Sequence, residues 1–280
     1  MQNRMAELSF QSSAAYSDPF NEVSLTAVVT DENGRETTVP GFWAGEGVWK
    51  IRFASPNTGV YSYRTSCSDA SNAGLHGQTG RIQIIPYEGD NPLYKHGPLR
   101  QSKNRKYLEH LDGSPFLWLG DTWWMALTKR LKWPEDFQEM IRDRVAKGFS
   151  VIQIVAGLYP DMDPFDERGA NNAGFPWDRN FQSINPDYFN EADHKLIALA
   201  EAGLVPCIVG CWGFFLEFAG EEVIRKHWDY LLARYGALPT VWCMAGEATM
   251  PFYTHPAFGN PEKTKEYNAK LRRGWTEMTR

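Results

Sequence analysis

The sequence lacks the short motifs that hold metals, nucleotides or redox centres in many enzymes. Its 4 cysteines form no C-x-x-C pair, and its 6 histidines show no H-x-H or H-E-x-x-H spacing. No G-x-G-x-x-G and no P-loop follows any apolar run. We therefore expect no metal and no cofactor, and we expect the cysteines to be small buried thiols.

Long apolar runs and blocks of like charge are also missing. No stretch approaches the ~20 apolar residues that span a bilayer, and a net charge of −5 without basic stripes argues against nucleic-acid binding. The opening residues, MQNRMAELSF, contain no apolar segment of a secretory signal. The chain as written is expected to be cytoplasmic, or secreted or periplasmic if a signal was trimmed before Met1.

Aromatic residues, by contrast, are abundant. The chain has 11 tryptophans, and aromatic residues make up 14% of it. Sugar-binding clefts use flat aromatic rings, because the apolar face of a pyranose packs on them, whereas tryptophan also fills large cores. Composition alone leaves both interpretations open.

The chain divides into two halves with different patterns. Residues 1–88 consist of short alternating runs about ten residues apart, separated by turn sequences, which predicts an all-β sandwich without a catalytic cluster. Residues 89–104 are rich in proline, glycine and polar residues and are expected to be a linker. Residues 105–280 begin with a hairpin and continue as alternating strands and helices.

Four apolar runs in the second half predict parallel strands buried on both faces: 116–119, 151–156, 205–209 and 241–245. Helices are expected from Pro134 and over 190–203, 221–236 and 261–278. A long insertion, 157–186, follows the second strand and is expected to be functional. This order fits a (β/α)8 barrel or a doubly wound sheet, and the missing glycine loop argues against nucleotide binding.

Polar and aromatic residues follow the predicted strands. Since the carboxyl ends of barrel strands open onto one face, these residues are candidates for a shared site. The candidates are Asp121, Trp123, Trp124, Tyr159, Trp212 and Glu247, together with Gln153 inside a strand and His255 in the loop after the last strand.

Each candidate also has a purely structural interpretation. Glu247 is either a general acid/base in a half-buried mouth or a strand-end acid paired with Arg or Lys. Asp121 either binds a sugar hydroxyl or caps the turn after its strand. The aromatic candidates and Gln153 are either cleft residues or core residues, and His255 either contacts substrate or lies on the surface.

Several segments together resemble the apiosidase-like glycoside hydrolases. They are FLWLGDTWW, VIQIVAGLYPD, DHKLIALAEAGLVPCIVGCWG and VWCMAGE, and the preceding VPGFWAGEGVWKIRFASPNTGVYSYRT resembles the Ig-like sandwich often fused before that barrel. The resemblance implies an α/β fold, with an Ig-like sandwich followed by the first half of a TIM-type (β/α)8 barrel. It also implies a glycosidase acting on plant or microbial polysaccharide or oligosaccharide, with Glu247 as general acid/base. Asp121, Trp123 and Trp124 would then contact the sugar.

Only 176 residues follow the linker, and four of the eight strands of a barrel are recognisable in them. Hydrolysis requires two carboxylates, and no second candidate follows a strand here. We therefore expect this chain by itself to be nearly inactive and, if the barrel is truncated, to self-associate through its open strand edges. The alternative function is a non-catalytic carbohydrate-binding protein that keeps the aromatic cleft.

Overall fold

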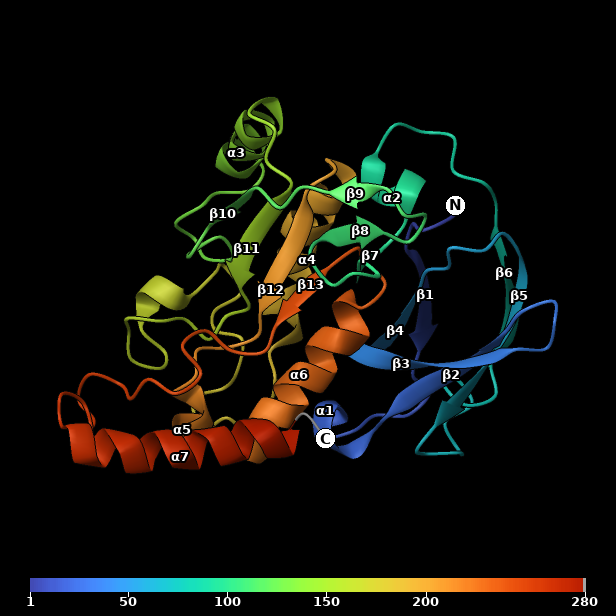
Figure 1. The fold of residues 1–280 in the computed structure, drawn as a ribbon. Helices are drawn as coiled ribbons and strands as arrows, with labels where there is room; N and C mark the ends of the chain where they lie inside the picture. Colours follow the sequence, from blue (N-terminus) through green and yellow to red (C-terminus); the bar gives the residue numbers. More distant parts are fainter. Residues whose placement is uncertain (279–280) are drawn as a thin grey trace.

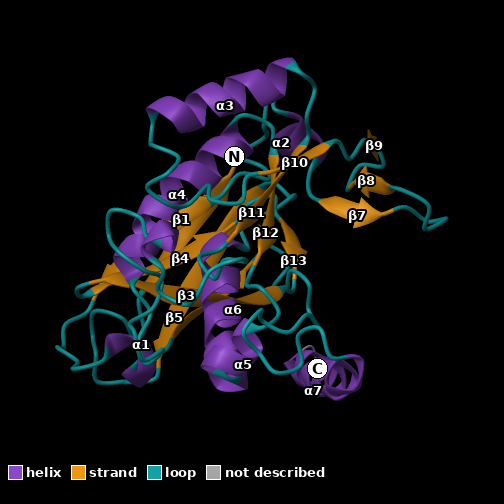
Figure 2. Ribbon diagram, turned by 90° about the vertical axis from the view of Figure 1, so that its left-hand side faces the viewer, coloured by secondary structure: helices purple, strands orange, loops and turns teal. Residues whose placement is uncertain are grey.

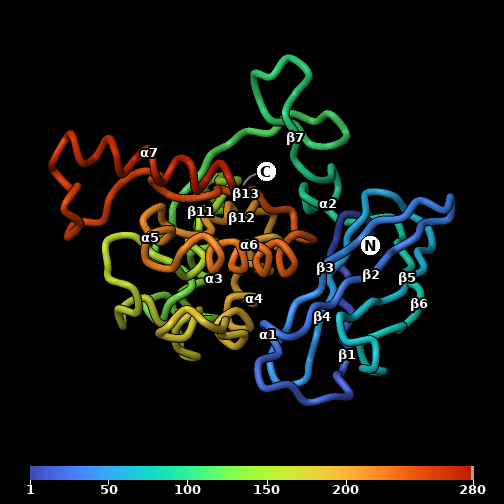
Figure 3. Tube along the Cα trace, turned by 90° about the horizontal axis from the view of Figure 1, so that it is seen from below, coloured from blue at the N-terminus to red at the C-terminus, as the bar shows by residue number. Residues whose placement is uncertain are grey.

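The fold, a computed structural model that describes residues 1–278, has an antiparallel β part and a parallel β/α part side by side (Figure 1). Figure 3 shows the N-terminal strands on one side of the molecule, with α4 and α6 between them and the rest of the chain. None of the helices within residues 1–278 is long and apolar enough to cross a membrane.

The N-terminal part is one continuous antiparallel sheet in the order β1-β4-β3-β2-β5-β6. The sequence predicted a sandwich of two sheets, but β3 pairs with β2 at one end and with β4 at the other, so the ladder is unbroken. The sheet closes around a core that includes Leu25, Trp49 and Ile51, as in a barrel that is nearly closed. Its elements are β1 (Ala6–Gln11), the short helix α1 (Pro19–Glu22), β2 (Leu25–Thr30), β3 (Glu36–Gly45), β4 (Val48–Phe53), β5 (Gly59–Cys67) and β6 (Thr79–Ile84).

The segment predicted as a linker contains regular structure. Helix α2 (Pro92–His96) begins with Pro92 after the side-chain cap of Asn91, and its Leu93 and Tyr94 are buried against the second half of the chain. β7 (Leu99–Gln101), β8 (Leu108–His110) and β9 (Pro115–Phe116) then form a small antiparallel sheet. The chain from 89 to 104 is therefore anchored by buried side chains.

The second half is built on a parallel sheet in the order β10-β11-β12-β13. The strands are β10 (Gly120–Thr122), β11 (Val151–Val155), β12 (Val205–Val209) and β13 (Val241–Cys243), and neighbours pair in parallel. β11, β12 and β13 lie within the predicted apolar runs. Ile152, Ile154 and Ile208 point into the large core under the helices. Val151, Val205 and Cys207 point to the opposite face, where α2 covers one end.

The prediction of the first parallel strand was wrong. It was expected over 116–119, but Phe116 belongs to β9 and pairs with Leu108, and the parallel ladder starts four residues later, where Gly120 lies opposite Val151. Leu117 between them is 77% exposed. The apolar run is interrupted because its first residue is already paired in another sheet.

Helices cover one face and one end of the parallel sheet (Figure 2). α3 and α4 pack together beside the sheet, and α6 lies between it and the N-terminal strands β3 and β4. α7 lies along the carboxyl ends of the strands beside α5 (Figure 1). The bounds are α3 (Glu135–Ala146), η1 (Glu167–Gly169), α4 (Pro186–Glu201), α5 (Phe215–Ala219), α6 (Glu221–Tyr235) and α7 (Pro261–Met278).

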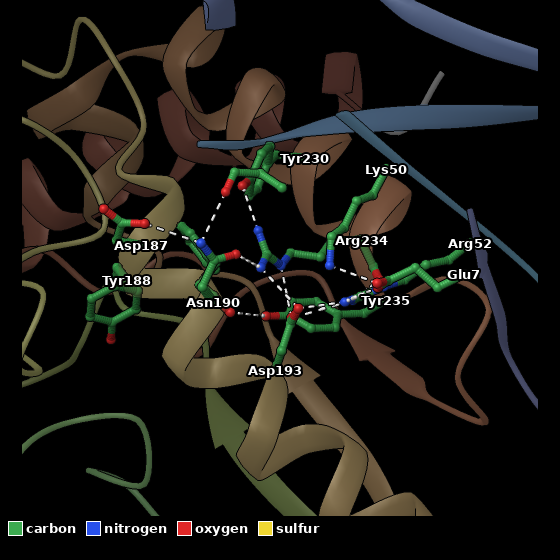
Figure 4. A network of polar contacts seen from close by, with 12 residues as sticks. Glu7, Lys50, Arg52, Asp187, Tyr188, Asn190, Asp193, Tyr230, Arg234 and Tyr235 are labelled. Atoms are coloured by element: carbon green, nitrogen blue, oxygen red, sulfur yellow. Dashed lines mark hydrogen bonds and ion pairs between the residues drawn. The ribbon is translucent and has the colours of Figure 1, made fainter. Parts of the chain in front are cut away.

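A buried ionic cluster joins the two halves of the molecule (Figure 4). Asp193 of α4 accepts hydrogen bonds from Arg234 of α6, at 2.8 and 2.9 Å, and from Arg52 of β4. The guanidinium groups of both arginines lie over the ring of Phe42, at 4.9 and 4.8 Å from its centroid. Burial opposes ionisation of Asp193, but the two arginines outweigh it and lower its pKa.

His227 links the 157–186 insertion to the end of β12. Its Nδ1 accepts a hydrogen bond from Trp177 Nε1 at 3.1 Å, so its Nε2 carries the proton and donates to the carbonyl of Gly210 at 2.8 Å. The ring is fully buried, and this burial lowers the pKa of His227 to about 4, although the Gly210 carbonyl favours the charged form. The Trp177 contact requires the neutral ring, because a protonated Nδ1 cannot accept a hydrogen bond.

We expect this histidine to make the fold sensitive to acid. Its pKa is lower in the folded chain than the ordinary 6.5, so the unfolded chain takes up the proton first and stability falls as the pH drops from 6.5 to about 4. The loss amounts to about 3 kcal/mol at about 1.4 kcal/mol per pKa unit. Urea unfolding across this range measures it. His227→Gln should flatten the slope, and His194→Gln, at an exposed ring stacked on Trp133, should leave it unchanged. A slope that survives His227→Gln contradicts the assignment.

Candidate active site

Three of the predicted site residues meet at the carboxyl end of the parallel sheet. The Nε1 of Trp212, after β12, donates a hydrogen bond to Oε2 of Glu247, after β13, at 2.9 Å. Trp124, after β10, packs edge-to-face on Trp212 with ring centroids 5.6 Å apart. Trp212 is buried whereas Trp124 is 47% exposed, so the cluster has a fixed base and an open aromatic face.

The backbone at Glu247 is built to present this side chain. Gly246 pairs with Trp212 in the last bridge of the parallel ladder, and a Cβ on Gly246 would lie only 2.1 Å from the Trp212 ring. Glu247 itself has a φ of +43°, a left-handed conformation that is strained for a residue with a side chain. Such strain is typical of functional positions. Glu247 is exposed, not half-buried as expected from the sequence.

The floor beneath this cluster is polar. Gln153 of β11 lies beside Thr122 of β10 in the parallel register, and its Nε2 donates to the Thr122 hydroxyl at 3.4 Å. Both side chains are partly exposed. Gln153 therefore has a hydrogen-bond partner and also lies on the face of the sheet opposite the core helices.

Asp121 and Trp123 lie on the other face of β10, toward α3. Arg144 of α3 donates to Asp121 Oδ2 at 2.6 Å, and Trp123 Nε1 donates to the same oxygen at 2.9 Å. Burial opposes ionisation of Asp121, but the hydrogen bonds from Arg144 and Trp123 and the positive charge of Arg144 together outweigh it and lower the pKa. Trp123 is buried against Phe137. The structure thus places both residues between sheet and helix, away from Trp124 and Glu247.

Tyr159 lies in the core. It is fully buried, and its hydroxyl shares a hydrogen bond of 2.7 Å with that of Tyr188 on α4. Burial raises the pKa of Tyr159 well above its usual value. Its position just after a strand was compatible with either a cleft or a core, and the insertion folds over it.

His255 lies at the edge of the same end of the molecule. Its Nε2 is 3.2 Å from Oε1 of Glu217 on α5, and its ring packs on Tyr267 of α7 at 4.5 Å. These three residues line a groove together with Lys270 and other residues of α7. His255 is therefore paired with an acid that the sequence analysis did not single out.

A contact between two loops above the sheet has no signal in the sequence. The hydroxyl of Tyr253, after β13, donates to the carboxylate of Asp161, after β11. Asp161, like Glu247, has a left-handed backbone, with φ of +57°. The nearby charges of Asp161 and Glu247 raise the pKa of Tyr253, with the Asp161 hydrogen bond as the larger cause. Only folding brings these loops together.

A buried lysine fixes the loop that carries Trp124. Lys195 of α4 donates its Nζ to the carbonyls of Ala126 at 2.6 Å, Leu131 at 2.7 Å and Thr128 at 3.3 Å. Burial lowers the pKa of Lys195 to about 8. Lys195 was not among the predicted site residues, because it is one charged residue on a largely apolar face of α4.

Comparison with known protein families finds two that match parts of the chain. The apiosidase-like catalytic domain family matches residues 102–280, and a domain family of unknown function, DUF5060, matches residues 2–68. No curated protein matches the chain.

One solved structure shares the fold over nearly the whole chain. A provisionally assigned glycoside hydrolase from Bacteroides vulgatus ATCC 8482 is 21% identical, with a TM-score of 0.70 over 99% of this chain and 53% of its own. A family 5 glycoside hydrolase from the same organism is 20% identical, with a TM-score of 0.46 over 68% of this chain and 38% of its own. The chain spans about half the length of the first of these proteins.

Proposed function

Because this chain belongs to the apiosidase-like family of glycoside hydrolases, we propose that it hydrolyses glycosidic bonds of plant or microbial polysaccharide or oligosaccharide, with Glu247 as general acid/base. The observation that carries the proposal is the position of Glu247. It follows the fourth parallel strand, is exposed, and is held by Trp212 beside the open ring of Trp124.

The architecture supports this role. We propose that β10 to β13 correspond to the first four strands of a (β/α)8 barrel and that residues 1–88 form an Ig-like accessory domain. In such a barrel the carboxyl ends of the strands carry the chemistry, and Glu247 lies at that end.

Glu247 would act in two steps. In the first, its protonated carboxyl gives a proton to the glycosidic oxygen while a second carboxylate attacks the anomeric carbon, so the leaving sugar departs and a glycosyl-enzyme ester forms. In the second, the Glu247 carboxylate takes a proton from the water that attacks the same carbon and releases the second carboxylate. The hydrogen bond from Trp212 Nε1 fixes one oxygen of the carboxyl and leaves the other for the reacting group. Trp124 provides a flat apolar ring for the sugar, and Gln153 and Thr122 provide polar groups on the floor.

A second carboxylate is needed for hydrolysis. Asp161, in the loop after β11, and Glu217, on α5, are acids at this end of the sheet, and they are bound by Tyr253 and His255 respectively. We assign the role of second carboxylate to neither of them.

A carbohydrate-binding protein without activity is the second candidate, favoured by the large exposed ring of Trp124. The protein expressed from its natural gene, incubated with plant and microbial polysaccharides, separates the two. Release of reducing sugar supports the hydrolase. Binding to the same polysaccharides without release supports the second candidate and overturns the first.

A further inference from the structure

The outer face of the N-terminal sheet carries a second groove, far from Glu247. It runs over β2, β5 and β6, and the last two strands lie on the side of the molecule farthest from the parallel sheet (Figures 1 and 3). Its lining includes Val28, Thr30, Glu36, Ser62, Arg64 and Arg81.

Two arginines in this groove have unused donors. Within residues 1–278, the guanidinium groups of Arg64 and Arg81 form no ion pair, and no hydrogen bond or ring contact holds either of them. The register pairs Arg64 with Thr79 and Arg81 with Ser62, so the two arginines are diagonal neighbours on the same face. Like charges this close repel each other, and a bound anion would relieve that repulsion.

Hydroxyl groups surround the two arginines. The register places Thr30 beside Ser62 and Val28 beside Arg64, so Thr30, Ser62 and Arg81 form a row across three strands. The side chains of this row point away from the core of the sheet, which is formed by the alternate positions Ala27, Val29 and Tyr61. The row offers charged and neutral donors at regular spacing along a groove.

A second hollow lies nearer the second half of the chain. Thr26, two residues before Val28 on the same face of β2, lines this hollow, which is also bounded by Pro40, Trp43 and Tyr230 of α6. The groove and the hollow lie on the same side of β2, and together they are called the trough. Two hollows along one strand suit an extended polymer better than a small ligand.

We propose that this trough binds a strand of acidic polysaccharide, with carboxylates of its sugars held by Arg64 and Arg81. A guanidinium group binds a carboxylate through two parallel hydrogen bonds, and the surrounding hydroxyls match the hydroxyls of the sugar. No tryptophan lines the arginine end, and the rings of Tyr63 and His76 that do line it are only partly exposed, so the two exposed arginines are the main contacts offered there. The choice of a polysaccharide over other polyanions rests on the proposed function.

Affinity electrophoresis tests the proposal without any need for turnover. The chain is run through native gels containing polygalacturonate, a neutral glucan or DNA. We expect retardation by polygalacturonate alone and, for the variant Arg64→Gln/Arg81→Gln, a dissociation constant about tenfold higher, because two charge-assisted contacts are lost. Both arginines are exposed, so unfolding curves of this variant should match the parent.

The matched control is Arg142→Gln/Arg272→Gln, which removes the same charge from exposed positions on α3 and α7. It should be retarded like the parent. Equal loss of retardation in both variants, or none in the parent, overturns the proposal. Retardation by DNA and not by polygalacturonate assigns the groove to nucleic acid instead, and equal retardation by the neutral glucan removes the role of the arginines. Either result leaves hydrolysis at Glu247 untouched.

Discussion

Replacing Glu247 with glutamine is expected to lower turnover by about 10²–10⁴-fold, the range of a single general acid/base, while sugar binding stays within about twofold. Glutamine keeps the shape of the side chain and an oxygen that can accept the Trp212 hydrogen bond, so the aromatic cluster should remain in place. What is lost is the acidic proton that a carboxyl group can transfer to the leaving oxygen. Reducing-sugar release measures the first quantity and titration calorimetry the second.

The leaving group provides a sharper test of the role. A natural sugar leaves only when its oxygen is protonated, whereas an activated aryl group needs little help. The loss of bond cleavage in Glu247→Gln should therefore shrink when aryl glycosides replace the natural substrate. The control is Glu139→Gln, at an exposed position on α3, which should leave both rates unchanged. An equal loss on both substrates contradicts an acid role for Glu247, and weakened binding would make it a binding residue.

Replacing Asp193 with asparagine is expected to cost about 3–5 kcal/mol of unfolding free energy, as is typical when one partner of a buried ion pair is removed. Asp193 is 7% exposed and balances Arg52 and Arg234, which are more deeply buried still. Asparagine would leave two guanidinium groups over the same phenylalanine ring without their counter-charge. Chemical unfolding measures the loss.

The position of Asp193 adds a second expectation. It binds Arg52 of the N-terminal sheet and Arg234 of α6, so its loss should weaken the junction and separate unfolding into two transitions. Asp229→Asn is the control, because Asp229 lies exposed on α6, the helix that carries Arg234. It should change stability by less than about 0.5 kcal/mol. Comparable losses in the two variants would show that the junction does not depend on Asp193.

Local sequence pattern predicted most of the second half of the fold. β11, β12 and β13 appear within the predicted apolar runs. β11 and β12 are buried, as strands covered on both faces are, whereas β13 is only half-buried. The first parallel strand was displaced because Phe116 pairs with Leu108 in another sheet. The single curled N-terminal sheet was also missed, since β3 pairs along its length with two partners and no local pattern encodes that.

The sequence by itself determined that Glu247 follows a strand, since that depends only on the apolar run before it. Which of the other candidates join Glu247 was decided by the tertiary structure. Trp212 and Trp124 meet it, whereas Trp123 and Tyr159 are buried in the core and Asp121 is paired with Arg144. The physical reason is that alternate residues of a strand face opposite sides, and the partner that claims each side chain lies far away in the chain.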